Sequence, residues 1–158
     1  MKIIFLDFDG VICTAESISS ATSRRRAGEL AGSDWNKFQI DPELVRNVRA
    51  LQEHMGAKIV ISSTWRLLDE LDVLKAWLHE RGGIDPSSVI DITPRRHDGS
   101  RGREIKDWLD LHPEVTSFKI LDDDSDVMDV PEFRKDWIHT SFIEGFCSQK
   151  LTWALMAD

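Results

Sequence analysis

The sequence predicts an α/β protein in which helices cover both faces of a mostly parallel sheet of about five strands. Two observations lead to this fold class. Short apolar runs alternate along the chain with longer amphipathic segments, as 57–61 does with 67–81. Strands that alternate with helices form βαβ units, whose right-handed crossovers produce a parallel sheet with both faces covered. The expected architecture is therefore three-layered and Rossmann-like.

The strands are predicted from short apolar runs that end at polar residues or glycine. Residues 2–6 form the first run, which contains β-branched side chains and is followed by an aspartate. Runs of this length and composition are typical of buried strands. The same criteria predict further strands at 57–61, 88–92 and 117–121, and a fifth at 136–139.

The helices are predicted from apolar residues at helical spacing and from residues that favour helix ends. Asp41-Pro42-Glu43 opens one helix, because aspartate is a good N-cap, proline suits the first position and glutamate favours the first turn. Gly56 ends this helix, at the position where glycine is common. Further helices are predicted at 67–81, 102–111 and 148–156.

Residues 11–40 interrupt the alternation of strands and helices. This segment is rich in Ser, Ala, Gly and Arg, and it includes Arg24-Arg25-Arg26. An irregular segment of this length in a compact domain is usually functional or mobile. We predict a small flap or ordered cap loop at 11–40, with a solvated disordered loop as the alternative, inside a single domain that spans 1–158.

The composition is that of a soluble globular protein, with a formal net charge of −8. This acidity argues against broad, nonspecific nucleic-acid binding, which depends on many Lys and Arg contacts to phosphates. No apolar run approaches the length of a membrane span, and the apolar run at 3–6 is too short for a signal peptide. A cytoplasmic location is the expected default. Cys13 and Cys147 show no metal-ligand spacing.

Polar side chains follow three of the predicted strands, at the point where each strand ends. Asp7 and Asp9, with Gly10 after them, follow the first strand, and Ser62 follows the second. Residues 122–126, which include four aspartates, follow the fourth. Ligands of parallel α/β sheets bind beyond the carboxyl ends of the strands, so these segments should converge on one rim. Crowded carboxylates repel one another unless a cation compensates, and Mg²⁺ is the usual cation beside phosphates.

These motifs resemble those of the haloacid dehalogenase-like (HAD) superfamily. The superfamily resemblance spans the chain in the expected order and rests on Asp7-Phe8-Asp9-Gly10-Val11, Ser62, and Asp122 followed by Asp126. Other segments resemble a small phage and bacterial branch that is related to HAD domains of multi-domain RNA-repair proteins. Those segments are Ile61-Ser62-Ser63-Thr64-Trp65-Arg66, Arg101-Gly102-Arg103-Glu104-Ile105 with Trp108-Leu109, and Ile120-Leu121-Asp122-Asp123-Asp124.

The resemblance implies a phosphatase that works through a covalent intermediate. Asp7 would attack phosphorus and form an aspartyl-phosphate. Asp9 would protonate the leaving oxygen and then deprotonate the attacking water. Ser62 would orient a phosphoryl oxygen.

The resemblance also implies a bound Mg²⁺ that shields the phosphate from the anionic nucleophile. Its ligands would be the Asp7 carboxylate, the Asp9 backbone carbonyl, the phosphate and Asp122. Asp126 would bind the metal through water, or it would hold a Lys or Arg in place. Asp123 is the rival for this role.

The sequence departs from the superfamily pattern at the positive charge beside the nucleophile. The superfamily has a lysine there, whereas the corresponding window of this chain holds Arg101 and Arg103, with Lys106 closer to the acids of the fourth strand. Arginine can serve, although it is not simply interchangeable with lysine. Arg101 is favoured because it fits the Arg-Gly-x-Glu-Ile pattern. Lys106 is the reserve candidate, and its alternative interpretation is a surface charge.

Residues next to these motifs are candidates for substrate binding: Gly10, Ser63, Arg66 and Arg103. Ser63 has an alternative interpretation as a helix N-cap. Arg66 has an alternative interpretation as the partner of an acid such as Asp69. Trp65 could stack on a base, with packing as the alternative.

The expected substrate is a phosphomonoester, with nucleic-acid ends or nucleotides favoured. Arg24-Arg25-Arg26 and Arg95-Arg96 could guide a polyanion toward an open site. A small-metabolite phosphatase is one alternative. A HAD-like binding or regulatory module without turnover is another, which the missing lysine leaves open. Neither membrane association nor an obligate protein partner is expected.

Overall fold

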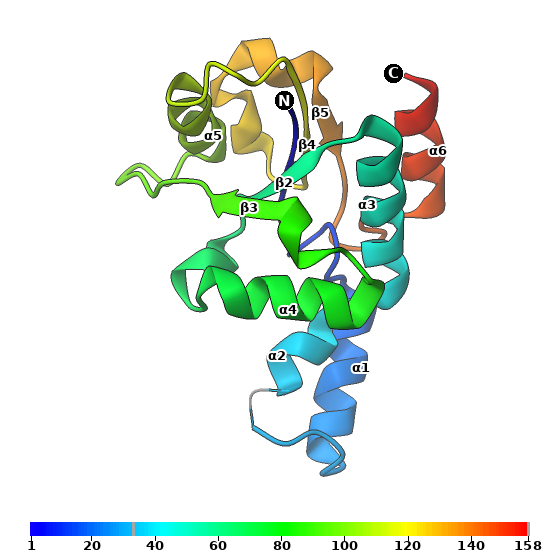
Figure 1. Cartoon of the computed structure of the whole chain (residues 1–158). Helices are drawn as coiled ribbons and strands as arrows, with labels where there is room; N and C mark the ends of the chain where they lie inside the picture. The colour runs from blue at the N-terminus through cyan, green and yellow to red at the C-terminus, as the bar shows by residue number, and fades with distance from the viewer. Residues whose placement is uncertain (33, 158) are drawn as a thin grey trace.

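The computed structural model describes residues 1–32 and 34–157, and its centre is a five-stranded parallel sheet (Figure 1). The order of the strands across the sheet is β3-β2-β1-β4-β5, and every neighbouring pair is parallel. The strands are β1 (Lys2–Leu6), β2 (Lys58–Ile61), β3 (Val89–Ile92), β4 (Ser117–Asp122) and β5 (Trp137–His139). The predicted α/β class and five-stranded sheet are confirmed.

Four of the helices correspond to those predicted: α3 (Pro42–Met55), α4 (Leu71–Gly82), α5 (Arg101–Asp110) and α6 (Ser148–Met156). Helix α3 begins and ends as expected, because the Asp41 side chain accepts the Glu43 N–H and Gly56 is left-handed at φ 63°. One-turn helices η2 (Pro86–Ser88), η3 (Ser125–Asp129) and η4 (Pro131–Lys135) complete the connections.

The helix predicted at 67–81 starts later than expected. A separate one-turn helix, η1 (Thr64–Leu67), comes first, and α4 begins only at Leu71. Ser63 caps η1, because its side chain accepts the Trp65 N–H at 3.2 Å. The N-cap interpretation of Ser63 is therefore the one that the structure shows, although the helix it starts is η1.

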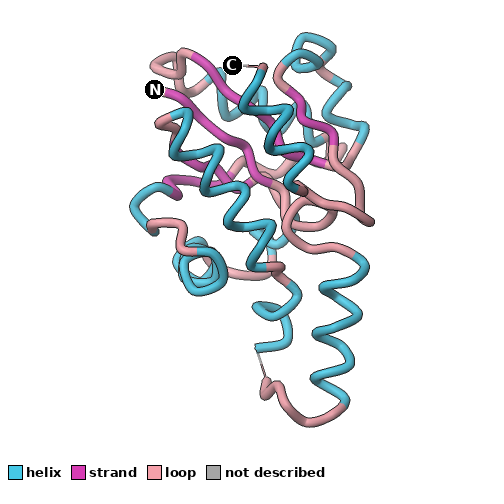
Figure 2. Tube along the Cα trace, turned by 90° about the vertical axis from the view of Figure 1, so that its right-hand side faces the viewer, coloured by secondary structure: helices cyan, strands magenta, loops and turns pink. Residues whose placement is uncertain are grey.

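Most of residues 11–40 is helical, which corrects the predicted loop, whereas a role as a flap or cap stays a prediction. They contain α1 (Ala15–Arg26) and α2 (Asp34–Gln39), which pack against each other as a hairpin that projects from the sheet (Figures 1 and 2). A capping box between Thr14 and Ser17 starts α1. Within α1 the one buried side chain is Ala21, so the helix lacks the apolar stripe by which helices are recognised in a sequence.

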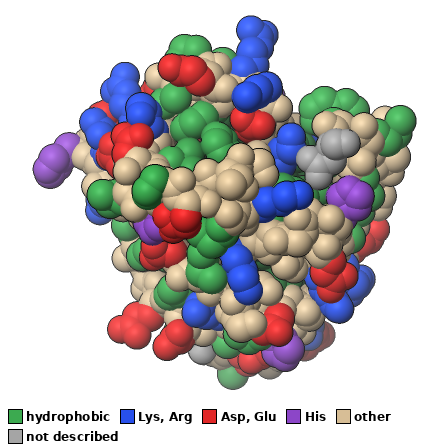
Figure 3. Space-filling model, turned by 45° about the horizontal axis from the view of Figure 1, so that its top comes forward, with side chains coloured by type: hydrophobic (Ala, Val, Ile, Leu, Met, Phe, Trp, Pro, Cys, Tyr) green, Lys and Arg blue, Asp and Glu red, His purple; other side chains and the backbone are tan. Residues whose placement is uncertain are grey.

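The sheet separates two apolar cores, which confirms the three-layer arrangement. Ile4 and Leu6 of β1 belong to the core under α3, α4 and α6. Ile3 and Phe5 belong to the opposite core, under α5, η3 and η4. Successive side chains of a strand point to opposite faces, so β1 contributes to both cores. Among the described residues, none of the helices has the length and apolar character of a transmembrane span. Acidic and basic side chains are interspersed on the face that Figure 3 shows.

Candidate active site

Asp7 and Asp9 lie in a tight turn that directly follows β1. The Asp7 N–H donates to the Leu121 carbonyl (3.0 Å), and Asp7 Oδ1 accepts the Phe8 N–H (2.8 Å). Gly10 has φ 75°, a left-handed conformation that glycine adopts without strain. A Cβ at Gly10 would also overlap the Asp123 side chain. The turn therefore holds Asp7 at the carboxyl edge of the sheet, against β4.

Asp7, Asp122 and Asp123 form a cluster of carboxylates at this edge. Each offers an oxygen, and these oxygens lie within 4.8 Å of one another. Burial, and then the charge of Asp7, raise the pKa of Asp122 well above its ordinary value and also raise the pKa of Asp123. The cluster thus carries charge that burial disfavours, and a divalent cation with oxygen ligands would compensate it.

The carboxyl groups of Asp9 and Asp126 are not part of this cluster. Asp126 instead holds the start of α5, because its Oδ2 accepts the Arg101 N–H at 3.0 Å. Of the two roles expected for Asp126, this contact fits that of holding an arginine in place. Its rival, Asp123, is the residue that joins Asp7 and Asp122.

Arg101, the first residue of α5, places a positive charge beside Asp7. Its Nη1 lies 3.2 Å from Asp7 Oδ1 and 2.8 Å from Asp122 Oδ2, so one guanidinium joins the ends of β1 and β4. Burial alone would lower the pKa of Arg101, but the charges of Asp7 and Asp122 outweigh it and raise this pKa. Of the three candidates for the positive charge beside Asp7, Arg101 is therefore the one that occupies this place, and its guanidinium is permanently charged.

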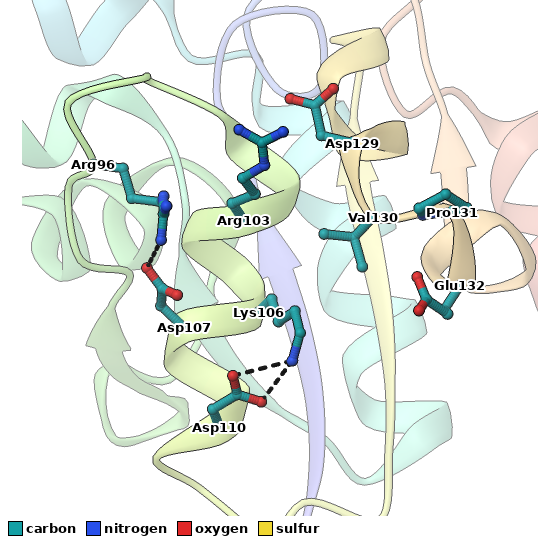
Figure 4. Close-up of a pocket in the computed structure, with 9 residues that line it drawn as sticks. All are labelled: Arg96, Arg103, Lys106, Asp107, Asp110, Asp129, Val130, Pro131 and Glu132. Atoms are coloured by element: carbon teal, nitrogen blue, oxygen red, sulfur yellow. Dashed lines mark hydrogen bonds and ion pairs between the residues drawn. The ribbon is translucent and has the colours of Figure 1, made fainter.

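Arg103 and Lys106, the other two candidates, do not contact this cluster, which corrects their expected placement. They line a pocket on another side of α5, facing η3 and η4 (Figure 4). Lys106 Nζ pairs with Asp110 (2.9 Å), and Arg103 Nη1 pairs with Asp98 (2.9 Å). At roughly 100° per helical residue, positions two and five after Arg101 fall on the opposite side of the helix.

Ser62 directly follows β2 and is fully buried. Its backbone is held on both sides, because its N–H donates to the Leu6 carbonyl (3.0 Å) and its carbonyl accepts from Arg66 Nη1 (2.8 Å). Ser62 Oγ has no hydrogen-bond partner among the described residues. Buried polar groups are nearly always paired, so the unpaired hydroxyl marks Ser62 as a candidate for binding a ligand oxygen.

Trp65 contacts Asp9, which sequence reasoning did not foresee. Trp65 Nε1 donates to Asp9 Oδ2 at 3.1 Å, and its ring packs on Phe8 with the centroids 5.1 Å apart. Burial raises the pKa of Asp9, the Trp65 hydrogen bond opposes it, and the charge of Asp7 raises it further, with a net rise. A carboxyl group with a raised pKa suits proton transfer. The two residues are 56 positions apart, so only the fold brings them together.

Arg66 does not present its guanidinium to a substrate, which corrects its assignment to substrate binding. Its side chain is 1% exposed and pairs with Glu104 at 2.7 Å rather than with Asp69. Its remaining hydrogen bonds go to backbone carbonyls. Sequence reasoning assigned no role to Glu104, because a charged residue inside an amphipathic helix is normally solvated.

The sheet, the acidic turn after β1 and the groups from β2, α5 and β4 define an α/β domain of the HAD class. Residues 3–151 match the family described as the HAD domain in Swiss Army Knife RNA repair proteins. The match covers nearly the whole chain, and the chain therefore belongs to this family. No curated protein and no solved structure was found to match it.

Proposed function

We propose that the protein is a Mg²⁺-dependent phosphomonoesterase in which Asp7 is the nucleophile. The observation that carries the proposal is the ion pair that joins Arg101 to both Asp7 and Asp122 at the carboxyl edge of the sheet. A carboxylate attacks a phosphate dianion only where positive charge offsets their repulsion. Arg101 supplies such charge, and it lies against the carboxylate that would react.

The proposed reaction has two steps. An Asp7 carboxylate oxygen forms a bond to phosphorus, the ester P–O bond breaks, and Asp9 gives its proton to the departing oxygen. Asp9, now ionised, takes a proton from water, whose oxygen attacks the same phosphorus. The bond between Asp7 and phosphorus then breaks, and inorganic phosphate leaves. The buried Ser62 hydroxyl donates to a phosphoryl oxygen in both steps.

A Mg²⁺ ion fits the carboxylates that are present. Oxygens of Asp7, Asp122 and Asp123 lie close enough to share one ion, and burial disfavours their uncompensated charge. When bound, the ion would supply positive charge to the phosphoryl oxygens. Asp124 supports the arrangement, because its N–H donates to Asp122 Oδ1 (2.9 Å) and fixes that carboxylate.

We favour nucleic-acid ends or nucleotides as substrates. The family description names RNA repair proteins, and the hairpin of α1 and α2 carries Arg24, Arg25 and Arg26 in the last turn of α1. Arg25 stacks over the Trp35 ring at 4.8 Å, which holds its guanidinium on the hairpin. A basic hairpin on an acidic molecule would attract a polyanion.

Hydrolysis of a generic aryl phosphate with Mg²⁺ tests the reaction class. We expect activity in the wild type and a loss of at least about a thousandfold in Asp7→Asn, since an amide cannot form the acyl phosphate. Equal rates in the two proteins would reject Asp7 as the nucleophile. Absence of turnover in the wild type would favour a binding or regulatory module.

A second comparison tests the substrate class. Oligonucleotides with 3′- or 5′-phosphates, nucleotides and sugar phosphates would be compared by kcat/KM under one set of conditions. We expect phosphorylated oligonucleotides to be the best substrates. A preference for sugar phosphates would instead identify a small-metabolite phosphatase.

A further inference from the structure

Arg66 and Glu104 form a buried ion pair where three segments of the candidate site meet. Arg66 Nη2 lies 2.7 Å from Glu104 Oε2, and the two side chains are 1% and 5% exposed. Arg66 belongs to η1, which follows β2, whereas Glu104 belongs to α5. The pair therefore joins two elements that carry separate groups of the site.

Arg66 uses its complete set of N–H groups on this junction. An arginine side chain has five N–H donors in a rigid planar fork. One of them binds Glu104, and the others bind backbone carbonyls at the ends of β2 and β3. These carbonyls are those of Ser62 (2.8 Å), Ser63 (2.8 Å), Thr93 (2.9 Å) and Pro94 (3.2 Å).

Glu104 lies in the same helix, α5, as Arg101, the residue that contacts Asp7. Its second oxygen, Oε1, accepts the Arg96 N–H at 3.0 Å, so it also holds the segment after β3. Glu104 lies three residues after Arg101, nearly one helical turn, and the two side chains project from the same side of α5. Movement of Glu104 would therefore move Arg101 relative to Asp7.

Stability alone is a weak explanation for this pair. Removing two charges from water is costly, and apolar side chains of similar volume often replace a buried ion pair without loss of stability. Burial lowers the pKa of Arg66 even though Glu104 opposes this effect, which shows that the desolvation is substantial. What an apolar pair could not reproduce is the set of directed hydrogen bonds to the strand ends.

We propose that Arg66 and Glu104 are positioning residues that set Ser62 and Arg101 at the spacing a phosphoryl group requires. This inference rests on the proposed phosphatase function. Arg66 supplies one of the two hydrogen bonds that hold the Ser62 backbone, and the Ser62 hydroxyl has no partner among the described residues. The planar fork is essential, since a lysine ammonium offers three donors from one point.

The test is the double variant Arg66→Met/Glu104→Met, assayed by aryl phosphate hydrolysis with saturating Mg²⁺ and by urea unfolding. We expect the variant to fold with a lower unfolding midpoint, because four backbone carbonyls lose their donor. We also expect a tenfold to hundredfold lower kcat, since displacements of about 1 Å cost that much. Arg66→Lys should also lose kcat. The matched control is Arg49→Met/Glu53→Met, which removes an exposed pair at 2.7 Å on α3 and should keep the wild-type kcat.

A second comparison separates positioning from a general structural role. The double variant Arg66→Met/Glu104→Met is called the Met pair. In a Ser62→Ala background, the Met pair should lower kcat by a clearly smaller factor than in the wild-type background, because part of its effect acts through the Ser62 hydroxyl. The same factor in both backgrounds, or a Met pair with wild-type kcat, overturns the proposal. If the Met pair does not fold, Arg66→Lys and Glu104→Gln are compared in the same two backgrounds.

Mg²⁺-dependent binding of inorganic phosphate, measured by calorimetry, distinguishes failure of this inference from failure of the proposed function. A wild type that hydrolyses no phosphomonoester removes the phosphatase proposal. The positioning role is then judged on binding alone. Weaker phosphate binding by the folded Met pair than by the wild type supports it, and equal binding overturns it.

Discussion

The position of Arg101 beside Asp7 could be predicted from a sequence pattern, but its full set of contacts could not. The Arg-Gly-x-Glu-Ile pattern favoured it over Arg103 and Lys106, and the structure places it within 3.2 Å of Asp7. The pattern could not show that the same nitrogen also contacts Asp122 at 2.8 Å. A guanidinium shared by two carboxylates fixes their separation as well as neutralising them.

Replacing Arg101 tests this double contact. Arg101→Met should lower kcat/KM for an aryl phosphate by about 10²–10³, since a preorganised charge at the reacting oxygens is lost. Arg101→Lys should fall between Met and the wild type, because it keeps the charge but not the fork. Steady-state kinetics at saturating Mg²⁺ measure both. A Met variant as fast as the wild type would contradict the role of Arg101.

The hydrogen bond from Trp65 to Asp9 leads to a second prediction at this scale. Trp65→Phe keeps an aromatic ring against Phe8 but removes the N–H that orients the Asp9 carboxyl. We expect kcat to fall about tenfold, the effect of losing one hydrogen bond to a charged group. Trp77→Phe is the control, because Trp77 packs edge-on against Trp65. Equal effects of the two changes would assign Trp65 to packing alone.

The elements could be predicted from the sequence wherever burial imposed a periodic pattern. Helix α3 buries Leu44, Val48 and Leu51 on one face, and the strands are short apolar runs. Helix α1 is stabilised differently, by a capping box and by contacts with α2. Because α1 buries only Ala21, its sequence has almost no apolar periodicity. The sequence therefore predicts a flap or loop at 11–40, where the structure has two helices.

The hairpin of α1 and α2 carries the prediction about nucleic acid. Arg25→Glu/Arg26→Glu should raise KM for a phosphorylated oligonucleotide several-fold and should flatten its salt dependence, because phosphate contacts are lost. Hydrolysis of an aryl phosphate should be unaffected. Arg46→Glu/Arg49→Glu on α3 makes the same charge change elsewhere and should alter neither substrate much. If both pairs of changes affect the oligonucleotide equally, the attraction is a net-charge effect and the hairpin has no special role.

At the scale of the whole molecule, the candidate site exists only because the sheet order places β1 between β2 and β4. That order brings Asp7, Ser62 and Asp122 to one edge, and the alternation of strands and helices was enough to predict this convergence. The contacts of Trp65, Arg66 and Glu104 could not be predicted in the same way. They depend on where side chains turn after each strand ends, and no local pattern in the sequence encodes this direction.

The acidic cluster should make the stability of the molecule depend on Mg²⁺. The pKa of Asp123 is raised in the folded protein, so its ionised form costs free energy there. This cost is absent at a pH below the unfolded-state pKa of about 3.9, and it grows as the pH rises through the folded-state pKa. The cost is therefore present in full at a pH above the folded-state pKa, unless a cation compensates it.

Asp123→Asn should consequently raise the Tm of the metal-free protein and reduce the further rise that Mg²⁺ produces. In the wild type, Mg²⁺ at a hundred times its Kd should stabilise the fold by about 2.7 kcal/mol. Thermal unfolding at pH 7, in a chelator and then in Mg²⁺, measures both effects. Asp72→Asn changes an exposed acid in the first turn of α4 and should leave the Mg²⁺ response intact. An identical Mg²⁺ response in the Asp123 variant and the wild type would exclude Asp123 as a ligand of the ion. The negative charges of Asp7 and Asp122 would then be compensated by Arg101, which pairs with both.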